Sequence, residues 1–173
     1  MESKRLILRR YIEEDAVELY NTLNDENVLH YIPEDKITME EAKNAVKWLI
    51  SNYDKGLDEN YKYSYVVESK ETGEYMGWCG FGYLDFDRSK TEIYYTLKSK
   101  FWNKGYATEA MELIMKEIDR LQIENIVALV KADNLPSKRV IEKLGFKFVR
   151  VVEDMEEEFK FYEGELLYER KNN

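Results

Sequence analysis

Residues 92–108 combine a carboxylate, a glycine turn and the start of a helix. "EIYYTL" alternates like a strand, and an amphipathic helix begins at about Gly105. The first backbone N–H groups of a helix are unpaired, the helix dipole is positive there, and a glycine lets an anion approach closely. The sequence therefore predicts an anion site, with local positive charge supplied by Lys98, Lys100 and Lys104. An ordinary loop whose glycine only serves the turn remains the alternative.

The segment "NKGYAT" lacks the glycine-rich pattern and terminal Lys-Ser/Thr of a nucleotide P-loop, so ATP and GTP are disfavoured. Cys79 is the only cysteine, which excludes an internal disulfide and a cysteine metal site. His30 is the only histidine, so a multi-histidine zinc site is impossible. We expect no metal centre.

The elements that must position this segment follow from the hydrophobic periods. Strands are expected at "KRLILRRY", "YKYSYVVES", "EYMGWCGFGYLDF", "KTEIYYTL", "IENIVALVKA", "FKFVRVVE" and "FKFYEGELLYER". Helices are expected at "EEDAVELYNTL", "TMEEAKNAVKWLISNY", from about Gly105 to Leu121, and at "NLPSKRVIEKL". The strand-helix-strand unit from "TEIYYTL" to "IVALV" should be parallel, and the other neighbours antiparallel. One mixed α/β domain, residues 1–173, results.

Composition excludes several functional classes. Hydrophobic residues make up 44 % of the chain, which is enough for a folded core. The net charge of −9 disfavours binding to nucleic acid, because phosphate recognition needs clustered Lys and Arg. No run reaches the ~18 apolar residues of a membrane span, so we expect no membrane partner. The lone cysteine fits a reducing compartment, and we expect a cytoplasmic protein.

The chain resembles the GNAT superfamily of N-acetyltransferases, in the branch of the ribosomal-protein N-terminal alanine acetyltransferases. The matching motifs run the length of the chain: "RLILRRYIEEDA", "VLHYIP" with "MEEAKNAVKWL", "GEYMGWCGF", "TEIYYTLKSKFWNKGYATEAM" and "ADNLPSKRVIEKLGFKF". The resemblance implies the GNAT fold, a mostly antiparallel twisted sheet of about seven strands with one parallel pair, flanked by about four helices. It specifies the family better than the substrate.

The resemblance also implies acetyl-CoA as the co-substrate and a place for it. The strand would line the pantetheine arm through Tyr95, Thr96 and Leu97. The turn and helix start would hold the phosphates through Asn103, Lys104, Gly105, Tyr106, Ala107 and Thr108, and Asn134 would add a further contact. Trp102, at the start of the turn, is usual in the resembled branch.

Amide formation needs a neutral amine and a proton for the departing thiolate. By resemblance, Glu92 is the candidate general base and Ser137 the candidate proton donor. Many members of the superfamily place a tyrosine where this chain has Ile141, which cannot donate a proton. A solvated strand glutamate and a serine in a first helical turn are the structural alternatives. No nucleophile for an acyl-enzyme is evident, so direct attack by the amine in a ternary complex is expected.

An aromatic wall for the acceptor is predicted from Tyr31, Trp78, Phe81 and Tyr83, although aromatics on strands also build cores. The leading interpretation is transfer of an acetyl group from acetyl-CoA to a primary amine. A non-catalytic acyl-CoA-binding regulatory module is the alternative. Protein N-termini and small-molecule amines remain equally open as acceptors, as do a monomer and a homodimer.

Overall fold

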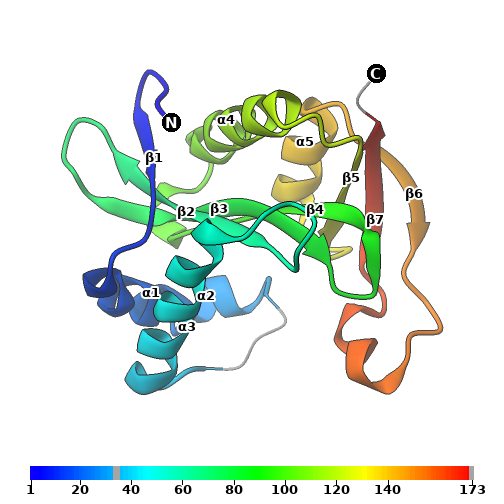
Figure 1. Cartoon of the computed structure of the whole chain (residues 1–173), viewed down its shortest axis with the longest axis horizontal. Coiled ribbons are helices and arrows are strands. Elements are labelled where there is room, and N and C mark those ends of the chain that lie inside the picture. The colour runs from blue at the N-terminus through cyan, green and yellow to red at the C-terminus, as the bar shows by residue number, and fades with distance from the viewer. Residues whose placement is uncertain (33–35, 172–173) are drawn as a thin grey trace.

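A computed structural model of the chain describes residues 1–32 and 36–171, which form one twisted seven-stranded sheet with helices on both faces (Figure 1). The strand order is β1-β2-β3-β4-β5-β7-β6, and β4 with β5 is the parallel pair. The fold class expected from the sequence is confirmed. The strands are β1 (Leu6–Arg9), β2 (Lys62–Ser69), β3 (Tyr75–Leu84), β4 (Asp87–Leu97), β5 (Asn125–Val130), β6 (Lys147–Val151) and β7 (Leu166–Lys171).

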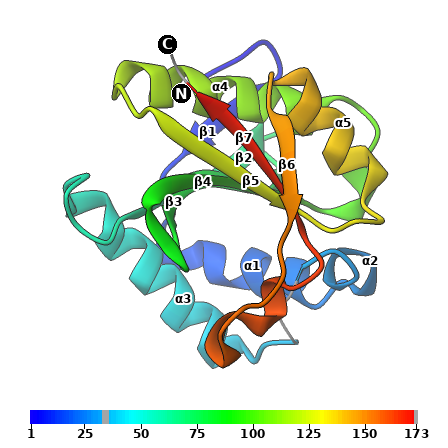
Figure 2. The ribbon, with the colours of Figure 1, turned by 90° about the vertical axis from the view of Figure 1, so that its right-hand side faces the viewer.

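Two groups of helices cover the two faces of the sheet (Figures 1 and 2). One face carries α4 (Tyr106–Arg120) and α5 (Leu135–Lys143), and the other carries α1 (Ala16–Leu23), α2 (Glu26–Leu29), α3 (Met39–Ser51) and the 3-10 helix η4 (Glu157–Tyr162). The apolar stripe of α4 is fully buried at Met111, Ile114 and Ile118, because it packs on the centre of the sheet. No helix in these described ranges is both long and apolar enough to cross a membrane.

Local capping interactions fix the starts of two of these helices. Thr38 and Glu41 form a reciprocal capping box at the start of α3. The Asn134 side chain accepts a hydrogen bond from the Ser137 backbone N–H, 3.1 Å away, at the start of α5. This cap fixes the position of Ser137, which matters for the site.

One predicted strand is shorter than expected. In "FKFYEGELLYER" the residues up to Tyr162 form η4, and β7 begins only at Leu166. Gly164 has a φ of 85°, which breaks the extended backbone between them, and the Tyr162 hydroxyl donates to Asp85 Oδ2 at 2.7 Å. The tertiary contact therefore outweighs the alternating pattern, and η4 is brought beneath the sheet on the same face as α1 and α3 (Figure 2). The single turn α2 was also not expected.

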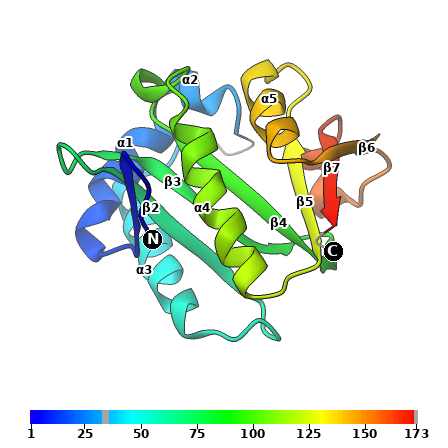
Figure 3. The same cartoon turned by 90° about the horizontal axis from the view of Figure 1, so that it is seen from above.

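The parallel pair β4 and β5 separates along its length. Register pairs join Thr91 to Ile126 and Glu92 to Val127, and no further pair joins these strands within the described chain. Viewed from above, β4 and β5 diverge after this point, with α4 and α5 on either side (Figure 3). The sheet is therefore open from Glu92 onward, at the segment that the sequence singled out.

Candidate active site

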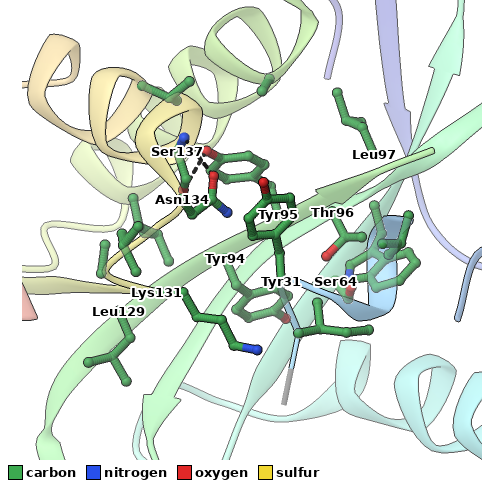
Figure 4. Close-up of a pocket in the computed structure, with 18 of the residues that line it drawn as sticks. Tyr31, Ser64, Tyr94, Tyr95, Thr96, Leu97, Leu129, Lys131, Asn134 and Ser137 are labelled. Atoms are coloured by element: carbon green, nitrogen blue, oxygen red, sulfur yellow. Dashed lines mark hydrogen bonds between the residues drawn. The ribbon is translucent and has the colours of Figure 1, made fainter. Parts of the chain in front are cut away.

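A cleft of about 610 Å³ occupies the gap between β4 and β5 and is lined from both faces of the sheet (Figure 4). Successive strand residues point to opposite faces, so Tyr95 lies towards α5 whereas Glu92 and Tyr94 lie towards α1 and α3. The α4 and α5 side of the cleft is lined by Tyr95, Asn103, Tyr106, Ala107, Asn134 and Ser137, among others. The cleft thus connects two chambers through the sheet: a first chamber on the side of α4 and α5, and a second chamber on the side of α1 and α3.

The start of α4 forms the open end of the first chamber. Gly105 has a φ of 78°, a left-handed conformation that favours glycine, and no side chain in the described residues caps the helix here. A Cβ built at Gly105 would meet only Arg5 Nη2, at 3.5 Å. The first N–H groups of α4 therefore lie at an uncapped, positive helix end, which supports the anion site as a proposal.

The lysines around this turn do not contribute in the way the sequence suggested. Lys98 forms an ion pair with Glu18, and Lys100 forms one with Glu74. The ammonium of Lys104 donates to the Lys100 carbonyl at 2.9 Å. Two of the three positive charges are thus neutralised. Their acidic partners come from α1 and from the turn before β3, so the local sequence did not show these ion pairs.

Arg5 supplies a positive charge beside the turn instead of these lysines, and the sequence analysis did not single it out. Its Nη1 donates to the Lys104 carbonyl at 3.0 Å, and its guanidinium lies 4.3 Å from the Tyr106 ring centroid. It also binds the Glu109 carboxylate, which accepts from Ser3 Oγ at 2.7 Å as well. Burial opposes ionisation of Glu109, but the bonds from Ser3 and Arg5 hold its pKa below the ordinary value. No local pattern could reveal Arg5, since 99 residues separate it from Lys104.

A hydrogen bond links two hydroxyl groups on the α4 and α5 side of the cleft. The Tyr95 hydroxyl donates to Ser137 Oγ at 2.8 Å, across the first chamber (Figure 4). Burial raises the pKa of Tyr95 to about 12, although the bond with Ser137 opposes this shift. Ser137 is thus held by the Asn134 cap at its backbone and by Tyr95 at its hydroxyl. Ile141, which replaces the familiar tyrosine, is buried in the wall of the same cleft.

Glu92 lies where β4 and β5 part, and its side chain is 9 % exposed. Thr96 and Leu97 also line the cleft. Lys104, Gly105 and Thr108 belong to the adjoining turn and helix start rather than to the lining. The indole N–H of Trp102 donates to the Leu97 carbonyl at 2.7 Å, which ties the turn to the end of β4.

The predicted aromatic wall is brought together only in part. Tyr31 and Trp78 line the second chamber. Phe81 is fully buried in the core under α4, because it lies on the opposite face of β3 from Trp78, and Tyr83 lines a separate hollow beside Arg88. The structure therefore does not place Phe81 and Tyr83 at the cleft, and the sequence could not show this without the strand register.

Residues that sequence reasoning missed complete the second chamber: Trp48 from α3, Lys62 from β2, Lys131 after β5, Tyr162 from η4 and Glu165 before β7. Burial, the charge of Glu92 and the hydrogen bond to Asp85 raise the pKa of Tyr162 well above its ordinary value. These side chains come from five separate segments that only the folded chain assembles.

The lone cysteine and the lone histidine lie outside this chemistry. Cys79 is completely buried, and burial raises the pKa of its thiol. His30 Nε2 lies 3.1 Å from Asp133 Oδ2 at the surface. In the described part of the chain, no group of three or more His, Cys, Asp or Glu side chains is arranged to hold a metal ion.

The comparisons with known proteins agree with this geometry. The model of the acetyltransferase (GNAT) domain matches residues 5–147. The uncharacterised N-acetyltransferase YnaD of Bacillus subtilis is 32 % identical over 84 % of this chain and 81 % of its own length. The chain therefore belongs to the GNAT family of acetyl-CoA-dependent N-acetyltransferases, and the resemblance seen in the sequence is confirmed at this level.

Solved structures show the same fold. The ribosomal-protein-S5-alanine acetyltransferase of Vibrio fischeri has a TM-score of 0.80 at 19 % identity, covering 100 % of this chain and 96 % of its own. The microcin C7 self-immunity acetyltransferase MccE, in complex with acetyl-CoA and AMP, has a TM-score of 0.79 at 19 % identity, covering 98 % and 94 %.

The residues present fit acetyl-CoA as co-substrate. The uncapped start of α4 and the left-handed Gly105 leave room for a phosphate. The separated strands offer an extended slot beside Tyr94–Leu97.

Proposed function

We propose that the protein transfers the acetyl group of acetyl-CoA to a primary amine, by direct attack of the amine in a ternary complex. The observation that carries this proposal is that one cleft contains both candidate proton-transfer groups. Glu92 lines the cleft from one face of the sheet, and the Tyr95–Ser137 pair lines it from the other. Acetyl-CoA supplies an activated acyl group as a thioester. The chain's own residues bind it, orient the amine and move protons.

On the second-chamber side, Glu92 accepts the proton of the attacking nitrogen, directly or through water. The bond from nitrogen to the carbonyl carbon forms while the bond from carbon to sulfur breaks. Backbone N–H groups of Tyr94–Leu97 polarise the carbonyl oxygen as an oxyanion site. Cys79 takes no part, since it is buried away from the cleft lining.

On the first-chamber side, Ser137 Oγ gives its proton to the departing sulfur and regains one from the Tyr95 hydroxyl. The hydrogen bond between the two supports this direction, because Tyr95 is the donor. Asn134 holds Ser137 in place and contacts the co-substrate. The phosphates lie at the turn, held by residues 103–108 through backbone N–H groups, with Arg5 beside them.

We expect Tyr95→Phe to lower kcat about 10-fold, and Ser137→Ala by a similar factor, since water replaces a lost donor only partly and general acid catalysis contributes roughly 100-fold or more. The double variant should be no slower than the slower single one, because the two hydroxyls act as one path. Steady-state kinetics with saturating acetyl-CoA measure this. Fully multiplicative losses would contradict a shared path.

Arg5→Ala should raise the KM for acetyl-CoA about 10-fold, because it leaves the Glu109 carboxylate unneutralised near the start of α4. Adding Glu109→Gln should restore most of the affinity, since it removes the repelling charge. Calorimetry measures the affinity for CoA of Arg5→Ala and of the double variant with Glu109→Gln. An equal loss in the single and double variants would show that Arg5 acts through packing on Tyr106 instead.

Release of the CoA thiol from acetyl-CoA, measured against peptides with free N-termini, polyamines and aminoglycosides, tests the function as a whole. Acceptor-dependent release is the expected result, and the panel separates protein from small-molecule acceptors. CoA binding without stimulation by any acceptor would favour the non-catalytic acyl-CoA-binding module.

A further inference from the structure

The second chamber of the cleft holds two buried carboxylates, and the proposed reaction uses only one. Glu92 stands on β4 and is 9 % exposed, and Glu165 precedes β7 and is 8 % exposed. Both line the cleft, and no other Asp or Glu of the described chain does. Neither lies on the side formed by α4 and α5. Negative charge in the cleft is therefore confined to the side where the acceptor enters.

The two charges act on the same small volume. The Tyr162 phenol, 7 % exposed, lines the chamber with them, and burial together with the charges of Glu92 and Glu165 raises its pKa. η4 lies beneath the sheet on the same side as α1 and α3 (Figure 2), and Glu165 stands in the short connection between η4 and β7. Glu165 is thus placed to meet a ligand that reaches Glu92.

The opposite wall is aromatic. Tyr31, Trp48 and Trp78 line it, and Trp48 is 44 % exposed at its rim. Aromatic faces attract cations. Lys62 already shows this preference, with its Nζ 5.3 Å from the Tyr94 ring centroid. The other lysine of the chamber, Lys131, donates to the His30 carbonyl at 3.0 Å.

We propose that Glu165 is a specificity-determining residue that binds the acceptor as an ammonium ion, so that the enzyme selects strongly basic alkylamines over peptide α-amines. This rests on the proposed function. At about pH 9 an alkylamine with a pKa of ~10.4 is still almost wholly protonated, whereas an α-amine with a pKa of ~7.7 to 8.0 is mostly neutral, so a site for the ammonium form discriminates between them there. A chamber of carboxylates and aromatic rings favours the first.

Protons balance in this scheme. The ammonium gives one proton to Glu92, and from there to solvent, before the nitrogen attacks. The second proton passes to Glu92 as the amide forms and then to solvent, and it balances the one that Ser137 gives to sulfur and regains through Tyr95 from solvent. Glu165 takes no part in the proton transfers and holds the cation on arrival.

A cation that cannot react tests Glu165 without requiring catalysis. An alkyltrimethylammonium ion should bind the protein saturated with CoA, measured by calorimetry. Glu165→Gln should weaken this binding about 10-fold, as expected for loss of a close charge. The neutral tert-butyl isostere should bind both proteins equally. Glu158→Gln, an exposed carboxylate on η4, serves as the matched control and should change nothing.

Equal binding of the cation to wild type and Glu165→Gln would overturn the proposal. So would an equal loss for the cation and its neutral isostere, because that would indicate a purely structural role. Both results come from binding measurements and do not depend on turnover. Failure of the proposed function would instead show as acceptors that do not stimulate release of the CoA thiol.

Shape-matched acceptors extend the test to turnover. At about pH 9, wild type should show a KM about 10-fold lower for an alkylamine than for its less basic 2,2-difluoro analogue, and Glu165→Gln should remove this preference with kcat little changed. Persistence of the preference in the variant would contradict the assignment. Free alkylamines compared with N-terminally blocked peptides that contain lysine identify the source of the amine.

Discussion

Gly105→Glu is expected to weaken acetyl-CoA binding on the order of 100-fold. Gly105 has a φ of 78°, which a glutamate adopts only with strain, and its Cα lies at the uncapped start of α4. The substitution adds a side chain and a negative charge where the phosphates are proposed to lie. Both effects act against binding. Calorimetry with CoA measures the loss directly.

Gly105→Ala is the control for this substitution. Its Cβ would meet only Arg5 Nη2, at 3.5 Å, so the space is available and the cost is the left-handed backbone, about 1 kcal/mol. We expect a loss of affinity well below that of glutamate. Unchanged affinity for CoA in Gly105→Glu, in a protein that still folds, would reject the phosphate site.

Glu92→Gln is expected to lower kcat about 100-fold at neutral pH, while the affinity for acetyl-CoA stays within about 2-fold, because a general base contributes roughly that factor. Glutamine keeps the size of the buried side chain but cannot take a proton. The loss should be largest at low pH, where the amine is mostly protonated, and should shrink as pH rises towards the pKa of the amine.

The pH profile of kcat/KM over several pH units checks this result. Glu112→Gln, an exposed carboxylate on α4, is the matched control and should follow wild type. A Glu92→Gln profile that coincides with wild type at every pH would show that another group, or water alone, removes the proton.

Much of the fold was predictable because its elements carry local signals. The stripe of α4, the capping box at Thr38 and the Asn134 cap depend on residues within a few positions of one another. The predicted strand that begins at Phe159 was wrong in its extent, since residues up to Tyr162 form a 3-10 helix. The hydrogen bond from the Tyr162 hydroxyl to Asp85 stabilises this helix, and the alternating pattern could not show it.

The candidate site divides in the same way. The turn at Gly105, the carboxylate of Glu92 and the hydroxyl of Ser137 could be found from the sequence, through helix-start chemistry and the family resemblance. The charge around the turn could not: two lysines are neutralised, and Arg5 approaches from the first strand. Phe81 and Tyr83 look like cleft residues until the register of β3 separates them from Trp78.

The sequence by itself determined the order of helices and strands, the family, and the segment where the co-substrate is proposed to lie, because these depend on periodicity and on motifs of contiguous residues. Only the tertiary structure decided which side chains share the cleft. Tyr95 contacts Ser137, and Glu92 and Glu165 line the same cleft, because β4 and β5 diverge and η4 folds beneath the sheet. Such long-range geometry leaves no mark on any short stretch of sequence.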